Sequence, residues 1–501
     1  MIAVSPYEME IIQKIIQKNV PHCDVLAFGS RLKWTHTDSS DLDLAVRGKE
    51  KLDIFRIQRM KEAFMESDIP YKVDVSDYHC ISDAFRKIID SGHELIYEGS
   101  VGNHNWKNVK AIDFIDFNPR ENISKGVSAK KIAMEQLLPF TRDILGYEVA
   151  PFNGGSKFRN GDTLMARITP CLENGKTAQV NILEDGEIGF GSTEFIVLRA
   201  KPNISDKDFI YYLAMSPILR DKAIKSMVGS SGRQRVQQGV LNDTEFFVPP
   251  LAEQIEIGRT LKTIDDKIAL NNKINICLEK IVQAIFKSWF VDFEPWGGVM
   301  PNDWSKAELG EYCMIKSGFA FKSSWWQEQG GVKVIKIKNI TNIGLNISDC
   351  SFVSDDKVSY AKDFIACAGD IVIAMTGATI GKFSIIPQHE GTLLINQRVG
   401  KFFLGKSSPF EKLPFLWCTL KHEPVFNEII SRGQGSAQPN ISPTDIMTIQ
   451  IVMPSKKAMD AFNKALENCF EIMATLPAEN EKLSAICDTL LPRLMSGEIK
   501  L

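Results

Sequence analysis

The chain of 501 residues lacks the features that mark several large classes of protein. Its ten cysteines are scattered and form no C-x-x-C pair, which argues against a disulfide scaffold and a zinc ribbon. No apolar run is long enough to span a membrane. The N-terminus has no basic start followed by an apolar core, so it is not a signal peptide. We therefore expect a reduced, cytoplasmic protein with no membrane partner.

A large excess of either charge is also lacking, since the net charge is −3. Residues 1–100 carry 13 Lys and Arg against 17 Asp and Glu. Residues 101–250 carry 19 against 17, and residues 301–455 carry 15 against 14. None of these balances would coat nucleic acid uniformly, so any contact with DNA must come from local basic patches.

Two motifs of DNA-modifying and ATP-hydrolysing enzymes are incomplete. Asn118-Pro119-Arg120 fails at the third position of the Asn-Pro-Pro-aromatic pocket used for base methylation. The run from Pro170 to Thr177 comes close to a phosphate-binding P-loop, but proline stands where the first glycine belongs. We expect the chain by itself neither to methylate bases nor to hydrolyse ATP at such a loop.

The longest predicted element is a helix from Leu251 to Phe290. It follows Pro249-Pro250, which can stand just before a helix but not inside one. Apolar residues recur three or four positions apart, as in a coiled coil. About forty residues at 1.5 Å each make a rod of roughly 60 Å, whose apolar face needs a partner.

The run from Met459 to Leu490 has the same spacing and offers that partner. Pro477 is expected to kink or split this second helix. We predict an antiparallel pair of helices that holds two globular units at a fixed distance. The alternative is two unrelated amphipathic helices, each packed on its own domain.

Residues 1–100 have the pattern of a small α/β unit. Strand alternation puts Asp41 and Asp43 on one face and Leu42 and Leu44 on the other, and Asp74 lies on the polar side of another strand. Helices are expected over 8–18, 52–66 and 82–90, and strands over 25–28, 41–46, 71–75 and 94–97.

Three carboxylates from neighbouring strands, those of Asp41, Asp43 and Asp74, can hold one or two Mg²⁺ ions. The turn at Gly29-Ser30 can meet a nucleoside triphosphate through backbone N–H groups and the Ser30 hydroxyl. This equipment suits in-line nucleotidyl transfer, because the metals neutralise phosphate charge and activate the attacking hydroxyl.

The stretch GSRLKWTHTDSSDLDL, from Gly29 to Leu44, and KVDV at 72–75 resemble the minimal nucleotidyltransferases of the polymerase-beta superfamily. The resemblance implies Gly29 and Ser30 as the phosphate turn, with Mg²⁺ and a nucleoside triphosphate as cofactors. It also implies the three aspartates as metal ligands. An intact fold that has lost its activity is an open alternative.

Residues 301–455 repeat the plan of residues 101–250, with an offset near two hundred. Each globule is followed by a long helix, which implies approximate two-fold symmetry within one chain. The matching pairs are Trp106 with Trp304, Gly161-Asp162 with Gly369-Asp370, Phe209 to Tyr211 with Phe415 to Trp417, Gly229 to Gly232 with Gly433 to Ser436, and Pro250 with Pro454.

A pair of equivalent sites held apart by a rod suits duplex DNA, which repeats about every 34 Å. Arg reads guanine, and Asn or Gln reads adenine, and both glycine-rich loops carry such residues. The candidate DNA-binding residues are Lys176, Arg233, Gln234 and Arg235 in the first globule and Lys382, Arg398, Gln434, Gln438 and Asn440 in the second. Further phosphate contacts are expected from Lys157, Arg159, Arg220, Lys225 and Lys401.

Several separate motifs stand in residues 106–501: GDIVIAMTGATIGK at 369–382, GQGSAQPNIS at 433–442, PPLAEQ at 249–254, FKSWFVDFEPW at 286–296 and LLPRLMSGEIKL at 490–501. With these motifs, residues 106–501 resemble the specificity subunit of type I restriction–modification systems. The resemblance implies two target-recognition domains, each reading one half of a split DNA sequence. It also implies helical regions that bind two methyltransferase subunits, with restriction (motor) subunits joining later. S-adenosylmethionine, ATP and Mg²⁺ are then expected on the partner subunits, and no cofactor on the specificity part.

The expected fold is therefore α/β (α+β), with a nucleotidyltransferase-like domain followed by two repeated α/β domains separated by long antiparallel helices. The expected segments are 1–100, 101–250, 251–300, 301–455 and 456–501. One hypothesis is a module that chooses a sequence on double-stranded DNA for a restriction–modification complex. A second is an enzyme whose residues 1–100 transfer a nucleotide to protein or RNA, in a toxin or antitoxin role. A third is a scaffold without sequence choice.

Overall fold

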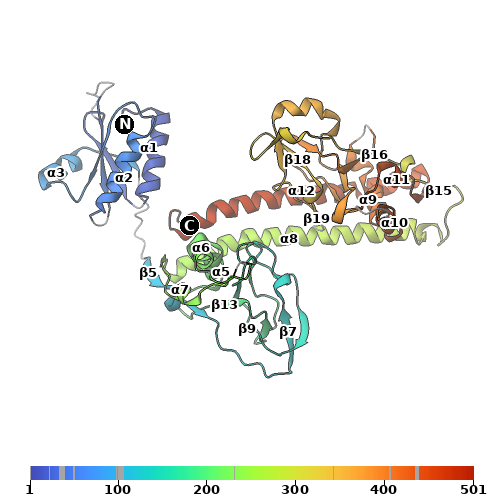
Figure 1. The fold of residues 1–501 in the computed structure, drawn as a ribbon, viewed down its shortest axis with the longest axis horizontal. Coiled ribbons are helices and arrows are strands. Elements are labelled where there is room, and N and C mark those ends of the chain that lie inside the picture. Colours follow the sequence, from blue (N-terminus) through green and yellow to red (C-terminus); the bar gives the residue numbers. More distant parts are fainter. Residues whose placement is uncertain are drawn as a thin grey trace. The chain divides into compact units, whose positions relative to one another are not determined.

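A computed structural model describes residues 2–21, 23–32, 40–48, 51–97, 99, 106–230, 232–341, 344–405, 408–434 and 439–501 (Figure 1). The predicted polar linker at 101–105 lies outside the described residues, as does most of the loop predicted at 35–40. The chain divides into two units, Met1–Asp265 with Ile486–Leu501, and Asp266–Ala485.

The N-terminal part is built on a four-stranded sheet of order β3-β2-β1-β4, in which only β2 and β3 are parallel. Every element predicted for this part is confirmed to within two residues at each end. The strands are β1 (Asp24–Phe28), β2 (Leu42–Arg47), β3 (Val73–Asp77) and β4 (Glu94–Tyr97), and the helices are α1 (Pro6–Asn19), α2 (Ile54–Met65) and α3 (Asp83–Ser91).

The two faces of this sheet have different partners. Leu42 and Leu44 of β2 are fully buried on the face that packs against α1 and α2. Helix α1 begins at a capping box, in which Ser5 and Glu8 each bond the backbone of the other. Ala45, on the opposite face, packs with Leu26, Phe28 and Ile89 of α3. Asp43 precedes Ala45 by two residues, so it shares this second face.

The first lobe, from β5 to β14, contains two four-stranded sheets and a two-stranded ribbon. Strands β5 (Lys107–Lys110) and β14 (Glu245–Val248) form the ribbon. One sheet, β11-β10-β13-β6, is wholly antiparallel and contains β6 (Ile115–Phe117), β10 (Thr163–Ala166), β11 (Thr177–Gln179) and β13 (Phe195–Ala200). The other, β8-β7-β12-β9, contains β7 (Ser128–Ile132), β8 (Glu148–Pro151), β9 (Ser156–Phe158) and β12 (Gly189–Gly191), with β7 and β12 parallel. The helices of the first lobe are α4 (Ala111–Phe114), α5 (Lys207–Met215), α6 (Pro217–Lys225) and α7 (Gln238–Asn242).

The second lobe, from β15 to β26, has the same plan. Strands β15 (Ser305–Glu308) and β26 (Gln450–Met453) form its ribbon. The antiparallel sheet β16-β25-β22-β23 contains β16 (Met314–Ser317), β22 (Ile371–Ala374), β23 (Phe383–Ile385) and β25 (Val399–Phe403). The sheet β17-β21-β18-β24 contains β17 (Trp326–Gln327), β18 (Val332–Ile335), β21 (Ser351–Val353) and β24 (Leu393–Ile395), with β18 and β24 parallel. The remaining elements include α9 (Leu413–Lys421), α10 (Glu423–Gly433), α11 (Pro443–Met447), and the short pair β19 (Ile340–Thr341) and β20 (Gly344–Leu345).

The duplication predicted from the sequence is confirmed at the level of single hydrogen bonds. In the first lobe the N–H of Arg159 donates to Oδ2 of Asp162 at 2.7 Å. In the second lobe the N–H of Cys367 donates to Oδ2 of Asp370 at 2.7 Å. The same aspartate therefore closes the same turn in both lobes, just before the strands β10 and β22.

The two long helices are α8 (Leu251–Phe290), with the bounds that we predicted, and α12 (Lys456–Met495). In one unit Leu261 of α8 packs in the same core as Leu494 of α12. In the other unit Phe290 of α8 contacts Phe462 of α12, with ring centroids 4.9 Å apart. The start of each helix therefore packs against the end of the other, so the pair is antiparallel. The alternative of two unrelated helices is wrong.

A polar layer interrupts the apolar seam within the second unit. Asn271, which has no exposed surface, donates hydrogen bonds of 2.8 Å to both Glu479 and Asn480. The side chain of Asn480 in turn donates to Asn272. A buried amide layer of this kind favours one register of the two helices, because any slip would leave the amides unpaired.

The expected split of the second helix at Pro477 is wrong, because α12 is continuous through it. Proline removes one helical N–H, a change that costs about 3 kcal/mol in a helix interior. The N–H of Gln388, from the second lobe, donates to the carbonyl of Ala474 three residues before the proline. Met473 and Ala474 are also buried in the core of that lobe. Tertiary contacts therefore hold the helix together here.

Candidate functional sites

The predicted base-reading residues of the second lobe gather where β22 ends. The N–H of Ala374 donates to the carbonyl of Lys382, and the N–H of Met375 donates to the carbonyl of Arg398. The N–H of Ile441 donates to the carbonyl of Met375, and Asn440 forms a β-bridge with Thr376. Three segments far apart in sequence therefore meet at one edge of the sheet. We call residues 375–377, 382, 398, 434 and 439–440 the second rim.

The first lobe has the same arrangement where β10 ends. The N–H of Ala166 donates to the carbonyl of Lys176, and the N–H of Arg167 donates to the carbonyl of Glu194. The N–H of Val236 donates to the carbonyl of Arg167, and Arg235 forms a β-bridge with Ile168. We call residues 167–169, 176, 194 and 233–235 the first rim. Position by position, Lys176 matches Lys382, Glu194 matches Arg398, and Arg235 matches Asn440.

The rims differ in how freely their predicted side chains can reach a ligand. Arg233, Arg235, Arg398, Gln434 and Asn440 are exposed, and Gln234 and Lys382 are half-buried. Lys176 is half-buried as well, and its Nζ donates to the carbonyl of Met134 at 2.9 Å. Gln438 lies outside the described residues. The structure therefore brings the described candidates together in each lobe, but it ties Lys176 to the backbone.

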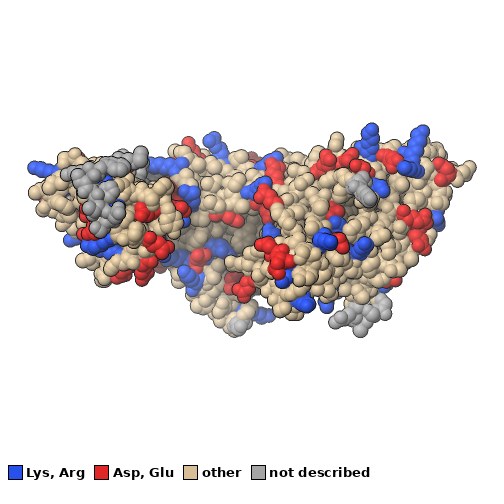
Figure 2. All heavy atoms as spheres, turned by 90° about the horizontal axis from the view of Figure 1, so that it is seen from above, with Lys and Arg blue, Asp and Glu red and all other residues tan. Residues whose placement is uncertain are grey.

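The surface drawn in Figure 2 shows Lys and Arg interspersed with Asp and Glu, without one large field of a single charge on that face. This agrees with the net charge of −3. Long-range attraction of a polyanion would be weak on such a surface, so contacts with DNA would depend on individual side chains.

Four of the lysines and arginines that we predicted to contact phosphate have partners within the protein. Lys401 is only 7% exposed, and its Nζ lies 2.5 Å from Oδ2 of Asp370. The Nζ of Lys157 donates to the carbonyl of Glu121 at 2.8 Å, and Arg159 pairs with the Glu121 carboxylate at 2.7 Å. The prediction was wrong for Lys401, because a charge turned inward must find a partner there. For Lys157 and Arg159 a contact with phosphate stays a prediction. Arg220 also has an internal partner, the carbonyl of Glu173 at 2.8 Å, while Lys225 is exposed.

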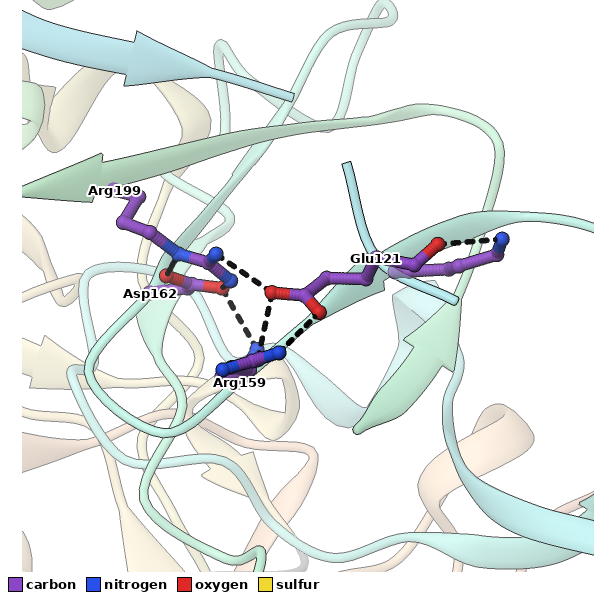
Figure 3. Close-up of polar contacts among 5 residues, drawn as sticks. Glu121, Arg159, Asp162 and Arg199 are labelled. Carbon is purple, nitrogen blue, oxygen red and sulfur yellow. Dashed lines mark hydrogen bonds and ion pairs between the residues drawn. The ribbon is translucent and has the colours of Figure 1, made fainter. Parts of the chain in front are cut away.

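Four charged side chains of the first lobe, those of Glu121, Arg159, Asp162 and Arg199, form one network of ion pairs (Figure 3). Arg199 of β13 donates to Asp162 at 2.7 Å and to Glu121 at 2.6 Å. The side chain of Glu121 is 3% exposed and that of Asp162 is 2% exposed. Burial alone would raise the pKa of Glu121, but hydrogen bonds from Arg199 and Arg159 outweigh it, and the pKa is lowered. The network therefore contains two buried carboxylates, each neutralised by arginine.

Replacing Glu121 with alanine is expected to destabilise the first lobe by about 2 kcal/mol, because Arg199 loses one of its two buried carboxylate partners and Arg159 loses its ion pair. Hydrogen exchange of the β13 amide groups measures this loss. Glu184→Gln is the matched control, since Glu184 is 86% exposed and its pair with Lys130 should contribute little. Equal losses for both variants would contradict the prediction.

The lowered pKa of Glu121 also sets the direction of a pH effect. Its contribution to stability is fully present above the ordinary carboxyl value of 4.5. It is lost as the pH falls through the lower value of the folded state, where protonation breaks the network. The β13 amide groups of the wild type should therefore lose protection in acid, and those of Glu121→Ala should lose less.

The predicted nucleotidyl-transfer residues lie on the second face of the N-terminal sheet. Phe28 is the register partner of Asp43, and Asp43 is the register partner of Asp74 on the parallel strand β3. Gly29 has φ +86°, and a Cβ there would lie 2.2 Å from Oδ2 of Asp43. The turn at Gly29 therefore lies so close to the Asp43 carboxylate that a side chain would not fit between them. Ser30 follows it and is half-buried.

The three aspartates share one acidic neighbourhood. Burial, followed by the charges of Asp74 and Asp41, raises the pKa of Asp43. Asp41 lies 3.9 Å from Nζ of Lys72, and Asp74 lies 3.5 Å from Nζ of Lys61. In the described ranges no three His, Cys, Asp or Glu side chains stand close enough to hold a metal ion together. Carboxylate oxygens are ligands that Mg²⁺ prefers. To bind the ion, Asp41 and Asp74 would have to give up their ion pairs with Lys72 and Lys61.

Substituting alanine for Gly29 is expected to disturb this site strongly. The new Cβ would overlap the Asp43 carboxylate, and the positive φ would cost about 1 kcal/mol or more for any L side chain. We expect lower thermal stability of the N-terminal part and loss of any nucleotide binding. Gly92→Ala is a suitable control, because a Cβ at Gly92 meets nothing within 4 Å. A variant at Gly29 that melts and binds like the wild type would contradict this prediction.

Comparison with known proteins shows which family has this architecture. The family model for the type I restriction modification DNA specificity domain matches residues 103–280 and 301–482, once for each lobe with its following helix. The chain belongs to this specificity family. The specificity subunit of the MjaVIII enzyme from Methanocaldococcus jannaschii is 29% identical over 329 residues, covering 63% of the chain and 75% of that protein.

A solved structure agrees with the fold of this specificity chain. The crystal structure of a type I system S subunit from M. genitalium aligns with a TM-score of 0.51 and 18% sequence identity. It covers 78% of the chain and 96% of that subunit. The repeated lobes and long helices of the chain are therefore those of a known specificity-subunit fold.

The N-terminal part of the specificity chain has relatives of its own. A family model for polymerase beta nucleotidyltransferases matches residues 10–101. A probable protein adenylyltransferase, MntA, from Haemophilus influenzae is 45% identical over 91 residues, covering 18% of the chain and 80% of that protein. The chain thus joins a nucleotidyltransferase-like domain to a specificity subunit, as the two resemblances in the sequence indicated.

No helix among the described residues is long and apolar enough to cross a membrane.

One functional candidate was missed at the level of sequence. Glu194 lies in the first rim and makes an ion pair of 2.6 Å with Arg235. Its carboxylate has the opposite sign to the residues sought for a contact with DNA. The signal that could have found it is the repeat itself, since Glu194 occupies the position of Arg398.

Proposed function

We propose that the chain chooses the DNA sequence for a type I restriction–modification complex, with each lobe reading one half of a split site. The long helices α8 and α12 would hold two methyltransferase subunits, and restriction subunits would join the complex. S-adenosylmethionine, ATP and Mg²⁺ would then be bound by those partners.

The observation that carries this proposal is the equivalence of the two rims. In each lobe the same backbone hydrogen bonds bring three distant segments to the end of one strand, β10 or β22. The side chains presented there differ, with Arg235 in one rim where Asn440 stands in the other. A duplicated frame with different polar side chains is suited to reading two different short sequences on one duplex.

Reconstitution tests the proposal. The purified chain, mixed with its methyltransferase subunits and S-adenosylmethionine, is expected to methylate adenine at a split sequence, and omission of the chain should abolish this. Methylome sequencing of cells with and without the gene should identify the same sequence. Equal affinity for random and cognate DNA would support a scaffold without sequence choice and would refute the proposal.

A second candidate function belongs to the N-terminal part. We infer that Gly29, Ser30, Asp41, Asp43 and Asp74 form a site for Mg²⁺ and a nucleoside triphosphate, used to transfer a nucleotide to protein or RNA. The close approach of Gly29 to the Asp43 carboxylate favours this, because it brings the backbone N–H groups of a glycine turn beside the proposed metal ligands. Aspartate-dependent transfer of label from ATP tests it.

A further inference from the structure

Arg235 and Glu194 form a matched pair at the first rim. The Nε of Arg235 lies 3.0 Å from both carboxylate oxygens of Glu194, and its Nη2 lies 2.6 Å from Oε1. One side of the guanidinium group is therefore occupied by the carboxylate. This two-point contact fixes both the position and the plane of the guanidinium.

The backbone of Arg235 is also held from two sides. It forms β-bridges with Ile168 and with Val228. Its N–H donates to the carbonyl of Val228 at 2.9 Å, and its carbonyl accepts from the N–H of Val228 at 3.0 Å. The carbonyl of Glu194 is fixed as well, since it accepts from Arg167. Both members of the pair are therefore placed by the same sheet edge and not by a free loop.

The pair contributes little to the stability of the fold. The side chains of Arg235 and Glu194 are 48% and 24% exposed, and an exposed ion pair is typically worth at most about 1 kcal/mol. Hydrogen bonds from Arg235 lower the pKa of Glu194, so the carboxylate stays ionised at neutral pH. What the pair does supply is a guanidinium that is already ordered before it meets a ligand, which reduces the entropy cost of binding.

The end of the Arg235 guanidinium group that carries Nη1 and Nη2 remains available to bind a ligand. Nη1 has no hydrogen-bond partner among the described residues, and Nη2 has a second hydrogen directed away from Glu194. These two parallel N–H groups match O6 and N7 of guanine in the major groove. We propose that Arg235 reads a guanine in the half-site of the first lobe, with Glu194 as its positioning residue. This inference rests on the proposed function.

Among the residues that the structure describes, the second rim does not contain such a pair. Asn440 occupies the position of Arg235, and Arg398 occupies the position of Glu194, as judged from the matching backbone bonds. The second rim thus has a guanidinium group where the first rim has a carboxylate, and an amide where the first rim has a guanidinium group. The proposed Arg235 contact therefore concerns the first lobe, and Asn440 provides a control in the other half of the site.

The test uses the assembled complex with its methyltransferase subunits. Methylome sequencing gives the split site of the wild type, and exchange of residues 301–455 shows which half belongs to the first lobe. Methylation rates are then measured on duplexes in which each base pair of that half is replaced in turn. The wild type should discriminate against loss of one guanine by about 10- to 100-fold.

The variants separate reading from simple attraction. Arg235→Ala and Arg235→Lys should both lose that discrimination at one position, because lysine keeps the charge but not the paired N–H groups. Glu194→Gln should reduce it partly. Arg233→Ala, in the same loop, should slow methylation of all sequences alike, as expected for a phosphate contact. Asn440→Ala should change only the other half-site.

Three outcomes would decide against the inference. A first half-site without guanine would overturn it, as would an Arg235→Lys variant that keeps the wild-type base preference. A uniform loss on all duplexes for Arg235→Ala, equal to that of Arg233→Ala, would make Arg235 a phosphate contact. A wild-type complex that methylates no split sequence at all would instead refute the proposed function, and so the two failures are distinguishable.

Discussion

Exchanging residues 301–455 for the corresponding segment of another specificity subunit is expected to change one half of the methylated site and to leave the other half unchanged. Methylation of the original site should fall by at least about a thousand-fold, because several base pairs of one half would be mismatched. The physical reason is that each rim is built within its own lobe. The segments that meet at β22 all lie between 371 and 441.

The exchange must preserve the packing of the core that the second lobe shares with α8 and α12. Phe290 of α8 packs against Phe415 and Trp304 of the lobe, with ring centroids 5.3 Å and 5.5 Å apart. A donor segment with aromatic residues at these two positions should keep the chain folded. Methylome sequencing of the chimaera is the measurement, and exchange of residues 106–248 is the reciprocal control. A change in both halves of the site from either exchange would refute the division of labour.

Simultaneous replacement of Asp41 and Asp43 with alanine is expected to abolish transfer of label from ATP by the N-terminal part. The loss should be about a thousand-fold or more, since metal ions held by these carboxylates would supply several kcal/mol of charge stabilisation. Asp68→Asn is the matched control, because Asp68 is an exposed aspartate of the same part. Labelled ATP, with candidate protein and RNA acceptors, gives the rate.

A binding measurement makes this second test independent of the acceptor. Mg²⁺ with ATP should raise the melting temperature of the N-terminal part in the wild type and in Asp68→Asn, since a ligand bound only by the folded state stabilises it. The double alanine variant should show no such shift. A wild type that neither binds nor transfers a nucleotide would identify the N-terminal part as an inactive relative of the nucleotidyltransferases.

The elements that depend on local periodicity could be predicted from the sequence. Helix α8 has the bounds that its double proline and apolar spacing indicate, and strand alternation predicts that Asp43 lies between the buried Leu42 and Leu44 of β2 on the opposite face. The division of residues 188–198 into two strands, β12 and β13, leaves no such signal. The turn between them is closed by Ser192, whose hydroxyl accepts from the N–H of Glu194. A local side-chain bond of this kind competes with strand pairing and leaves no periodic signal.

The direction in which a surface charge points could not be predicted from the sequence. Lys401 reads as a free lysine, yet it is buried against Asp370. In the other lobe the equivalent aspartate, Asp162, is bound by Arg199, two positions further along the corresponding strand. Pairing across neighbouring strands decides this, and such partners lie far apart in the sequence. The clustering of the described candidates in each lobe was more predictable, because the repeat indicates equivalent segments in both lobes.

The core of the first lobe is completed by residues from the far end of α12. Leu494 and Met495 are buried together with Ile257 and Leu261 of α8 and with Phe246 of the lobe. On the ribosome, the lobe that is made first must therefore wait for residues 486–495 before its apolar face is closed. A translation product that stops before this segment would expose that face to chaperones and proteases. Only a chain that reaches α12 can present the first rim in a finished domain.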